Sequence, residues 1–137
     1  CMKPLLTHLP AQSLEEVEKQ LSAYPDTDIR LVPPRSRKLG TYSRTPEGRH
    51  IITLNDNLPP YVMLIVLVHE MAHLENRLQN GSTVSPHGKE WKAIYTRMLK
   101  EYIYRNIFPK DISELLMHHA LKPCATFPKE LSRLLKK

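Results

Sequence analysis

The chain has 137 residues, of which 41% are hydrophobic and 25% charged, so it can bury the core of one domain and is unlike a wholly disordered chain. Two cysteines, Cys1 and Cys124, are too few for a disulfide scaffold or a four-cysteine zinc site. The longest apolar run, Tyr61 to Val68, is far shorter than the ~20 residues that span a bilayer, and no signal-peptide core is recognisable. We therefore expect a cytoplasmic protein, not a secreted one, with no membrane partner.

The net charge of +6 is unevenly distributed along the chain. Residues 30–50 hold six basic side chains against one acidic side chain, a net charge of +5. Residues 122–137 hold five against one, a net charge of +4, whereas residues 1–29 have a net charge of −3. Two basic zones can meet a polyanion such as nucleic acid. A solvated surface that keeps the protein soluble is an equally weighted alternative.

The first predicted elements are a helix and three short strands. Ser13 and Glu16 have the spacing of a capping box, which predicts a helix that ends before Pro25. Three segments of strand-like composition follow, at residues 28–32, 38–44 and 49–55. The last two are joined by Thr45-Pro-Glu-Gly48, which has the composition of a turn. We expect the three strands to form one small sheet.

A long helix is predicted next, from about Pro60 to about Gln79, with Asn80-Gly81 as its stop. Its first half is apolar on every side, which is typical of a helix in the middle of a domain. Three further helices are expected: one capped by Ser85-Pro86, one over 111–123 opened by a second capping box, and a short basic one after Pro128. Together these elements predict a single domain over 1–137. Its core would span about 28–105, followed by a helical, basic segment over about 111–137.

The central helix carries the sequence His69-Glu-Met-Ala-His73. Two histidines four residues apart on a helix share one face, so both imidazoles can ligate one metal ion. Zinc lowers the pKa of bound water to about 7, and a neighbouring carboxylate such as Glu70 can take the proton. This pattern indicates a metal-dependent peptidase. The alternative is a helix whose polar end simply emerges into solvent.

A catalytic zinc site needs a third protein ligand, and His87 is our choice because it lies at the expected start of the next helix. Glu90, one turn further on, is the competing ligand or a partner of a ligand. His118 and His119 are weaker candidates, and they join Tyr95 and Tyr102 as candidates for an oxyanion donor that the sequence does not choose between. For Tyr95 and Tyr102, and for Trp91, packing in the core is the favoured interpretation.

The segments Val68-His-Glu-Met-Ala-His-Leu74 and Pro86-His-Gly-Lys-Glu-Trp91 resemble the SprT-like family, which includes the Spartan proteases. Lys38-Leu-Gly-Thr-Tyr42 and Ile51-Ile-Thr-Leu-Asn55 also look like the strands that precede the metal helix in that family. The resemblance covers roughly residues 30–105. Trp91 stands where the family usually has Phe.

The resemblance implies a zincin-like fold, with one catalytic Zn²⁺ held by His69, His73 and His87 and with Glu70 as general base. It also implies proteolysis of proteins crosslinked to DNA, as in the characterised eukaryotic members. Many members carry a C-terminal zinc ribbon, but here only Cys124 is present in that region, without a Cys-x-x-Cys pair. This departure puts DNA binding in doubt, because the ribbon can contact nucleic acid.

Two sets of residues outside the metal motif are candidates for substrate contacts. An edge strand over 38–44 can hold an extended peptide, with Tyr42 facing the cleft, although an ordinary sheet position is at least as well supported. Five basic side chains flank the strands and are candidates for phosphate contacts: Arg35, Arg37, Lys38, Arg44 and Arg49.

The sequence therefore predicts an α+β, zincin-like domain in which a small three-stranded sheet packs on a central metal-binding helix. Its expected function is that of a zinc-dependent peptidase acting on DNA-associated or DNA-crosslinked proteins, nucleoid-associated if the source is bacterial. The alternative is a zinc-containing nucleic-acid-binding module without significant peptidase activity. A metal-dependent hydrolase with a non-peptide substrate is a third, weaker reading.

Overall fold

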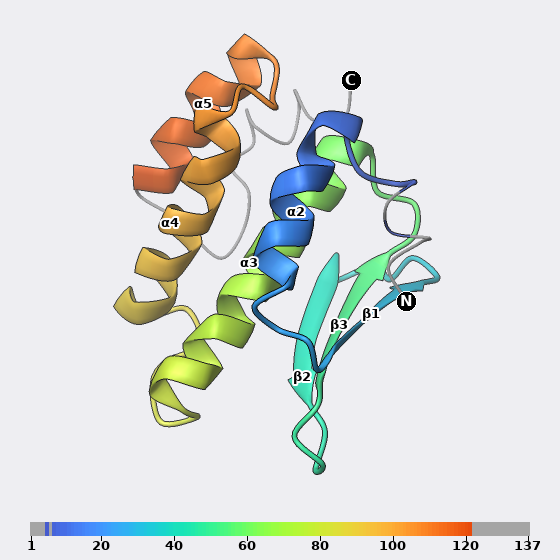
Figure 1. The fold of residues 1–137 in the computed structure, drawn as a ribbon, viewed down its shortest axis with the longest axis vertical. Coiled ribbons are helices and arrows are strands. Elements are labelled where there is room, and N and C mark those ends of the chain that lie inside the picture. Colours follow the sequence, from blue (N-terminus) through green and yellow to red (C-terminus); the bar gives the residue numbers. More distant parts are fainter. Residues whose placement is uncertain (1–4, 6, 122–137) are drawn as a thin grey trace.

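The computed structural model describes residue 5 and residues 7–121, and it has the predicted α+β architecture (Figure 1). The elements in chain order are η1 (Ala11–Ser13), α2 (Leu14–Leu21), β1 (Thr27–Val32), β2 (Gly40–Arg44), β3 (His50–Asn55), α3 (Pro60–Asn80), α4 (Lys89–Tyr104) and α5 (Lys110–Leu121). The two cysteines, the basic zone over 122–137 and the helix expected after Pro128 lie outside the described residues.

The three strands form one sheet in the order β1-β3-β2, as expected. β1 runs parallel to β3, whereas β2 and β3 are antiparallel neighbours joined by the predicted turn. The N–H of Gly48 donates to the carbonyl of Thr45 at 2.9 Å, and Gly48 has a φ of +87°, which glycine adopts without a steric penalty. Because β3 lies in the middle, β2 is an edge strand of this sheet.

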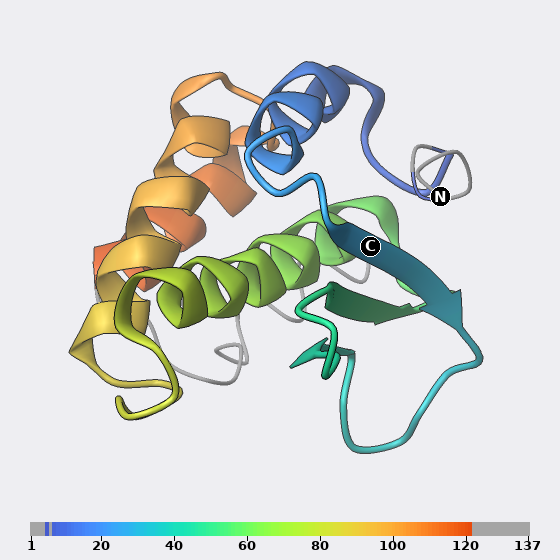
Figure 2. The same ribbon diagram turned by 60° about the horizontal axis from the view of Figure 1, so that its bottom comes forward.

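Helix α3 is the centre of the molecule and has nearly the predicted bounds. It lies between the sheet on one side and the pair α4 and α5 on the other (Figure 2). Every side chain from Val62 to Val68 is buried, as the continuous apolar run requires. Gly81, with a φ of +70°, ends the helix and donates its N–H to the carbonyl of Arg77 at 2.9 Å.

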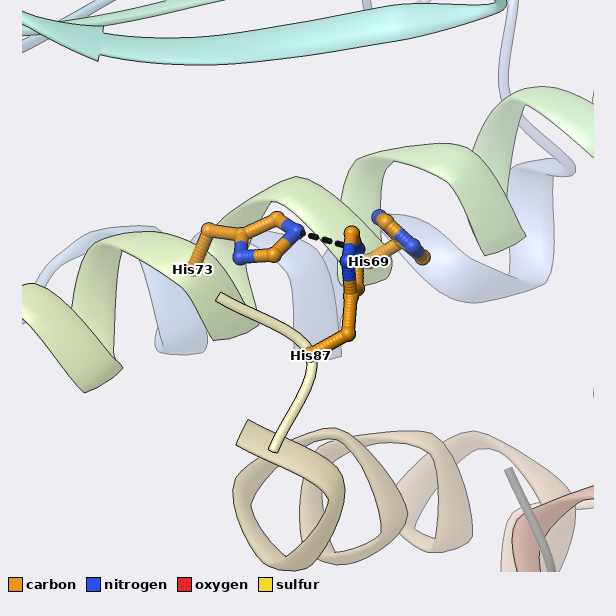
Figure 3. Close-up of side chains that lie close together, drawn as sticks. All are labelled: His69, His73 and His87. Atoms are coloured by element: carbon orange, nitrogen blue, oxygen red, sulfur yellow. Dashed lines mark hydrogen bonds between the residues drawn. The ribbon is translucent and has the colours of Figure 1, made fainter. Parts of the chain in front are cut away.

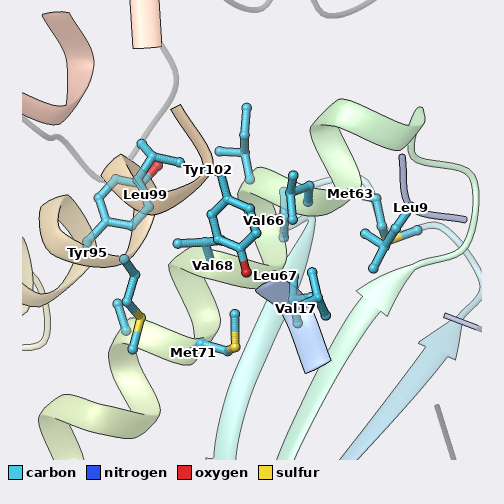
Figure 4. Close-up of a cluster of buried hydrophobic side chains, with 14 of the residues drawn as sticks. Leu9, Val17, Met63, Val66, Leu67, Val68, Met71, Tyr95, Leu99 and Tyr102 are labelled. Atoms are coloured by element: carbon cyan, nitrogen blue, oxygen red, sulfur yellow. The ribbon is translucent and has the colours of Figure 1, made fainter. Parts of the chain in front are cut away.

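The hydrophobic core surrounds α3 (Figure 4). Side chains from the N-terminal segment, α3 and α4 meet there, among them Leu9, Val17, Met63, Leu67, Met71 and Leu99. Tyr95 and Tyr102 are fully buried, which confirms that both pack in the core. No helix among the described residues is both long and apolar enough to cross a membrane.

The helix caps differ from those predicted. Ser13 does not cap α2, because its hydroxyl donates to the carbonyl of Pro10 at 2.6 Å and Glu16 instead pairs with Arg105 at 3.0 Å. The expected cap at Ser85 is also wrong: residues 85–88 form a turn, closed by the Gly88 N–H and the Ser85 carbonyl, and α4 begins at Lys89. Asp111 already lies inside α5, where its carboxylate accepts from the N–H of Ile112. The Ser13 hydroxyl and the Glu16 carboxylate thus have other partners in the folded protein, so the predicted capping box does not form.

Candidate metal centre

Three histidines converge beside the middle of α3 (Figure 3). His69 and His73 come from successive turns of α3, and His87 comes from the turn that precedes α4. One ligand atom from each imidazole lies within 4.8 Å of the others, and the Nε2 atoms of His73 and His87 are 3.0 Å apart. One helix and the turn before the next helix thus place three nitrogen donors around one point.

These donors fit a metal ion such as zinc. The Nε2 atom of His69 is buried and has no hydrogen-bond partner among the described residues. A buried polar atom without a partner is unfavourable, and a bound cation would satisfy it. On the other side of the same ring, Nδ1 lies 3.3 Å from Oε2 of Glu70. A carboxylate at that position orients the imidazole and leaves Nε2 to the metal.

The charge state of the site also suits metal binding. Burial, together with repulsion from His69 and His87, lowers the pKa of His73 to about 3. The pKa of His87 is lowered too, mainly by burial and by His69, although the nearby Glu70 opposes that shift. Both imidazoles are therefore neutral near pH 7, which is the form that ligates a metal ion.

Aromatic side chains of α4 form the wall behind the histidines. Trp91 is fully buried, stacks on His73 with 5.2 Å between ring centroids, and donates its N–H to the carbonyl of His69 at 3.4 Å. Tyr95 stacks on Trp91, and its hydroxyl lies 3.1 Å from Nε2 of His119 on α5. The predicted packing role of Trp91 is confirmed, and α5 supports the site through Tyr95 and His119.

A cleft of about 480 Å³ lies in front of the histidines. One wall consists of all five residues of β2, and the other consists of α3 and the segment that follows it. The lining residues from α3 are His69, Glu70, His73, Asn76 and Arg77, and those after it are Gly81, Ser82, Val84, Pro86 and His87. An edge strand and the three imidazoles therefore face the same space.

The remaining predicted site residues lie in different places. Tyr42 lines the cleft as expected, and its hydroxyl is bonded to Nδ1 of the buried His50 at 2.8 Å. Glu90 is half-buried on the first turn of α4 and is not part of the group of ligand atoms formed by the histidines. Of the two weaker candidates on α5, His118 is exposed, whereas His119 is buried against Tyr95.

The five basic candidates have different surroundings. Arg35 is held by Asn55 and Thr53, to which its guanidinium donates at 2.9 and 3.0 Å, so it supports the loop before β2. Arg37 and Lys38 are exposed in that loop, and Arg49 lies 3.8 Å from Asp26 in an exposed ion pair. Arg44 is the member of the set that lines the cleft.

Sequence reasoning missed one residue of the cleft. Arg77 lines the cleft, and its position eight residues after His69 could have revealed it, because the same helical face continues to that turn. His119, a weaker candidate from the sequence, is not among the grouped ligand atoms; it is bonded to Tyr95 behind the histidines, a contact that no spacing within α5 predicts.

Comparison with known proteins gave one match: a model of the SprT-like family matches residues 9–113. The matched range contains the sheet, the three histidines and Glu70. Neither the curated proteins nor the solved structures gave a match.

Proposed function

Because this chain belongs to the SprT-like family, we propose that it is a zinc-dependent peptidase whose substrates are DNA-associated proteins. The observation that carries the proposal is the convergence of three histidine ligand atoms within 4.8 Å beside Glu70 on one wall of a cleft. Three imidazoles with one open side are the donor set of a catalytic zinc site.

His69, His73 and His87 would hold the ion, with His69 binding through its buried Nε2 atom. When bound there, zinc supplies a Lewis acid that polarises a peptide carbonyl and makes water acidic enough to lose a proton near neutral pH. Trp91 keeps the imidazoles in place, because it packs against all three rings.

Glu70 is the general base of the proposed reaction. Its carboxylate is nine-tenths buried and lines the cleft, and Glu70 follows His69 directly on α3. It accepts a proton from the water whose oxygen forms the new bond to the peptide carbonyl carbon. It then passes that proton to the amide nitrogen as the C–N bond breaks, so the products are a carboxylate and an amine.

The edge strand β2 is the proposed support for the substrate backbone. One edge of β2 pairs with β3, and all five residues of β2 line the cleft. The other edge of such a strand presents N–H and C=O groups that can pair with an extended peptide. A peptide held in this way passes in front of the histidines.

The proposal of a DNA-associated substrate rests on the family and on charge. The net charge is +6, and residues 30–50 alone contribute +5. Exposed Arg37 and Lys38 are available for phosphate contacts, whereas Arg35 is engaged in the loop. Contacts of this kind predict DNA binding that weakens steeply as the salt concentration rises and depends little on the base sequence.

The test incubates zinc-loaded protein with a DNA-binding protein substrate, with and without single-stranded DNA, beside a Glu70→Gln variant. We expect cleavage by the original protein and none by the variant, while both retain one zinc ion. A requirement for DNA would support the proposed class of substrate. Zinc and DNA binding without cleavage would favour a nucleic-acid-binding module, and activity on a panel of non-peptide esters alone would favour a different hydrolase.

A further inference from the structure

We propose that Arg44 and Arg77 form a subsite for an acidic side chain of the substrate, at the end of the cleft beyond His73. The inference rests on the proposed function, because it assigns a substrate preference to the same cleft. It adds Arg77, which no sequence pattern had assigned to the site, and it gives Arg44 a peptide carboxylate as its partner instead of a phosphate.

Arg77 continues the line of functional side chains along α3. His69, His73 and Arg77 are spaced four residues apart, so they lie on one face of the helix. Each step of four residues advances about 6 Å along a helix axis. Arg77 is half-buried and lines the cleft, one turn beyond the second histidine.

Arg44 reaches the same end of the cleft from the opposite wall. Gly40 lies against α3 at Val66, where a Cβ added to Gly40 would be 2.7 Å from Val66 Cγ1. Tyr42 and Arg44 follow on the same face of β2, because side chains alternate along a strand. β2 therefore runs from the level of Val66 toward the later turns of α3, and Arg44 comes last.

Electrostatic interactions support the convergence of the two guanidinium groups. Burial raises the pKa of the Tyr42 hydroxyl, and Arg77 and Arg44 both act in the opposite direction, by a smaller amount. Burial is the main cause of the lowered pKa of His50. Both arginines lower this pKa further, whereas the nearby Asp26 raises it. Two arginines, one from each wall, thus act on the same Tyr42–His50 pair.

Neither arginine has an ion-pair partner among the described residues. The ion pairs of other arginines in the described part of the chain are Arg30 with Asp28, Arg49 with Asp26, and Arg105 with Glu15 and Glu16. None of these pairs involves Arg44 or Arg77, and Glu70 is the single acidic residue among the described residues that line the cleft. An incoming carboxylate would therefore meet two cations with no competing partner beside them.

A peptide side chain fits this position better than a DNA phosphate does. An extended peptide advances about 3.3 Å per residue, so a side chain about two residues from the cleaved bond reaches the turn that carries Arg77. Guanidinium groups bind carboxylates through paired, charge-assisted hydrogen bonds, which gives both affinity and orientation. The exposed cations of the preceding loop, Arg37 and Lys38, do not line the cleft, so no row of phosphate contacts leads into it.

The first experiment measures kcat/KM for peptides that share one cleavage site and carry Asp, Gln or Lys at each of the flanking positions in turn. We expect Asp to be favoured over Gln by about tenfold or more at one position within three residues of the cleaved bond. The Arg44→Gln, Arg77→Gln double variant should lose this preference, and Arg77→Glu should favour Lys there. Arg30→Gln, an exposed arginine outside the cleft, is the matched control and should keep the preference for Asp.

The second experiment separates this inference from the proposed peptidase activity. Fluorescence anisotropy measures binding of the same peptides to zinc-loaded Glu70→Gln protein, with and without the two arginine substitutions. Tighter binding of the Asp peptide that depends on Arg44 and Arg77 would support the subsite even if no peptide were cleaved. Equal binding of Asp and Gln peptides, or a preference that survives the double substitution, would overturn it. So would arginine substitutions that weaken binding of a short single-stranded oligonucleotide but not of the acidic peptide.

Discussion

The indole ring of Trp91 lies nearly parallel to the imidazole of His73, with 5.2 Å between the ring centroids and 22° between the planes. The same indole donates its N–H to the backbone carbonyl of His69. One buried side chain from α4 therefore contacts both histidines of α3, and it also packs edge-on against His87. The position of α4 on α3 and the geometry of the histidines are thus linked.

Replacement of Trp91 by Phe should weaken zinc binding as well as the fold. The variant loses the indole N–H and part of the stacking surface. Substitution of a residue that orients metal ligands typically lowers the metal affinity by about 10- to 100-fold. We expect a loss of about tenfold in zinc affinity, measured by competition with a chromophoric chelator.

Tyr102→Phe is the matched control for the Trp91 substitution. Tyr102 is also fully buried on α4, but its hydroxyl donates to Gln20 at 2.8 Å, away from the histidines. Its loss should lower the free energy of unfolding by about 1 kcal/mol and leave zinc affinity unchanged. Equal effects of both substitutions on zinc affinity would show that Trp91 acts through global stability alone.

Removal of the histidines should abolish zinc binding and the stability that zinc provides. At a free zinc concentration 100 times its Kd, the ion should raise the free energy of unfolding by about 2.7 kcal/mol. We expect the His69→Ala, His73→Ala double variant to bind no zinc and to show no such increase in thermal denaturation. His118→Ala, which removes an exposed histidine of α5, should retain both. One zinc ion per molecule in the double variant would show that the metal site is elsewhere.

The zinc-free protein should become less stable as the pH falls below about 6.5. Burial lowers the pKa of four histidines in the folded protein: His50, His73, His87 and His119. Between the lowered pKa and the ordinary value of 6.5, these side chains are neutral in the folded protein and take up protons on unfolding. Unfolding is therefore favoured by acid, and the stability that these neutral side chains contribute is fully present only above about pH 6.5.

This pH dependence can be measured by urea denaturation in the presence of a chelator. The free energy of unfolding should fall by up to about 1.4 kcal/mol per pH unit for each histidine that is protonated only on unfolding. The His50→Gln variant should show a shallower slope than the original protein. A free energy of unfolding that stays constant or rises between pH 6.5 and pH 5 would contradict the prediction.

Gly40→Ala should disturb the cleft through its β2 wall. A Cβ at this position would lie 2.7 Å from Val66 Cγ1 and 2.9 Å from the carbonyl oxygen of Thr53, so β2 would have to move away from α3. We expect a loss of about 1–3 kcal/mol in the free energy of unfolding and a higher KM for peptides. Gly48→Ala also destabilises, because of its positive φ, but lies outside the cleft and should leave KM unchanged. Equal values of KM in both variants would show that β2 does not hold the substrate.

Local chemistry made much of the fold predictable from the sequence. The capping failures at Ser13 and Ser85 show where this reasoning ends. Both serines had the right sequence context, but each found a hydrogen-bonding arrangement in a neighbouring turn. A cap is decided by competition between nearby partners, and that competition depends on how the chain enters the helix.

The sequence by itself determined the shared face of His69 and His73, the bounds of α3 and the turn at Gly48. Each of these follows from backbone geometry over a few residues: the helical repeat, the glycine that stops a helix and the glycine that allows a positive φ. Only the tertiary structure decided between the alternatives that the sequence had left open: it places His87 rather than Glu90 with the pair, β2 opposite the histidines, and His119 buried against Tyr95. These relationships join residues far apart in sequence, so they depend on how whole elements pack around α3, which no local pattern encodes.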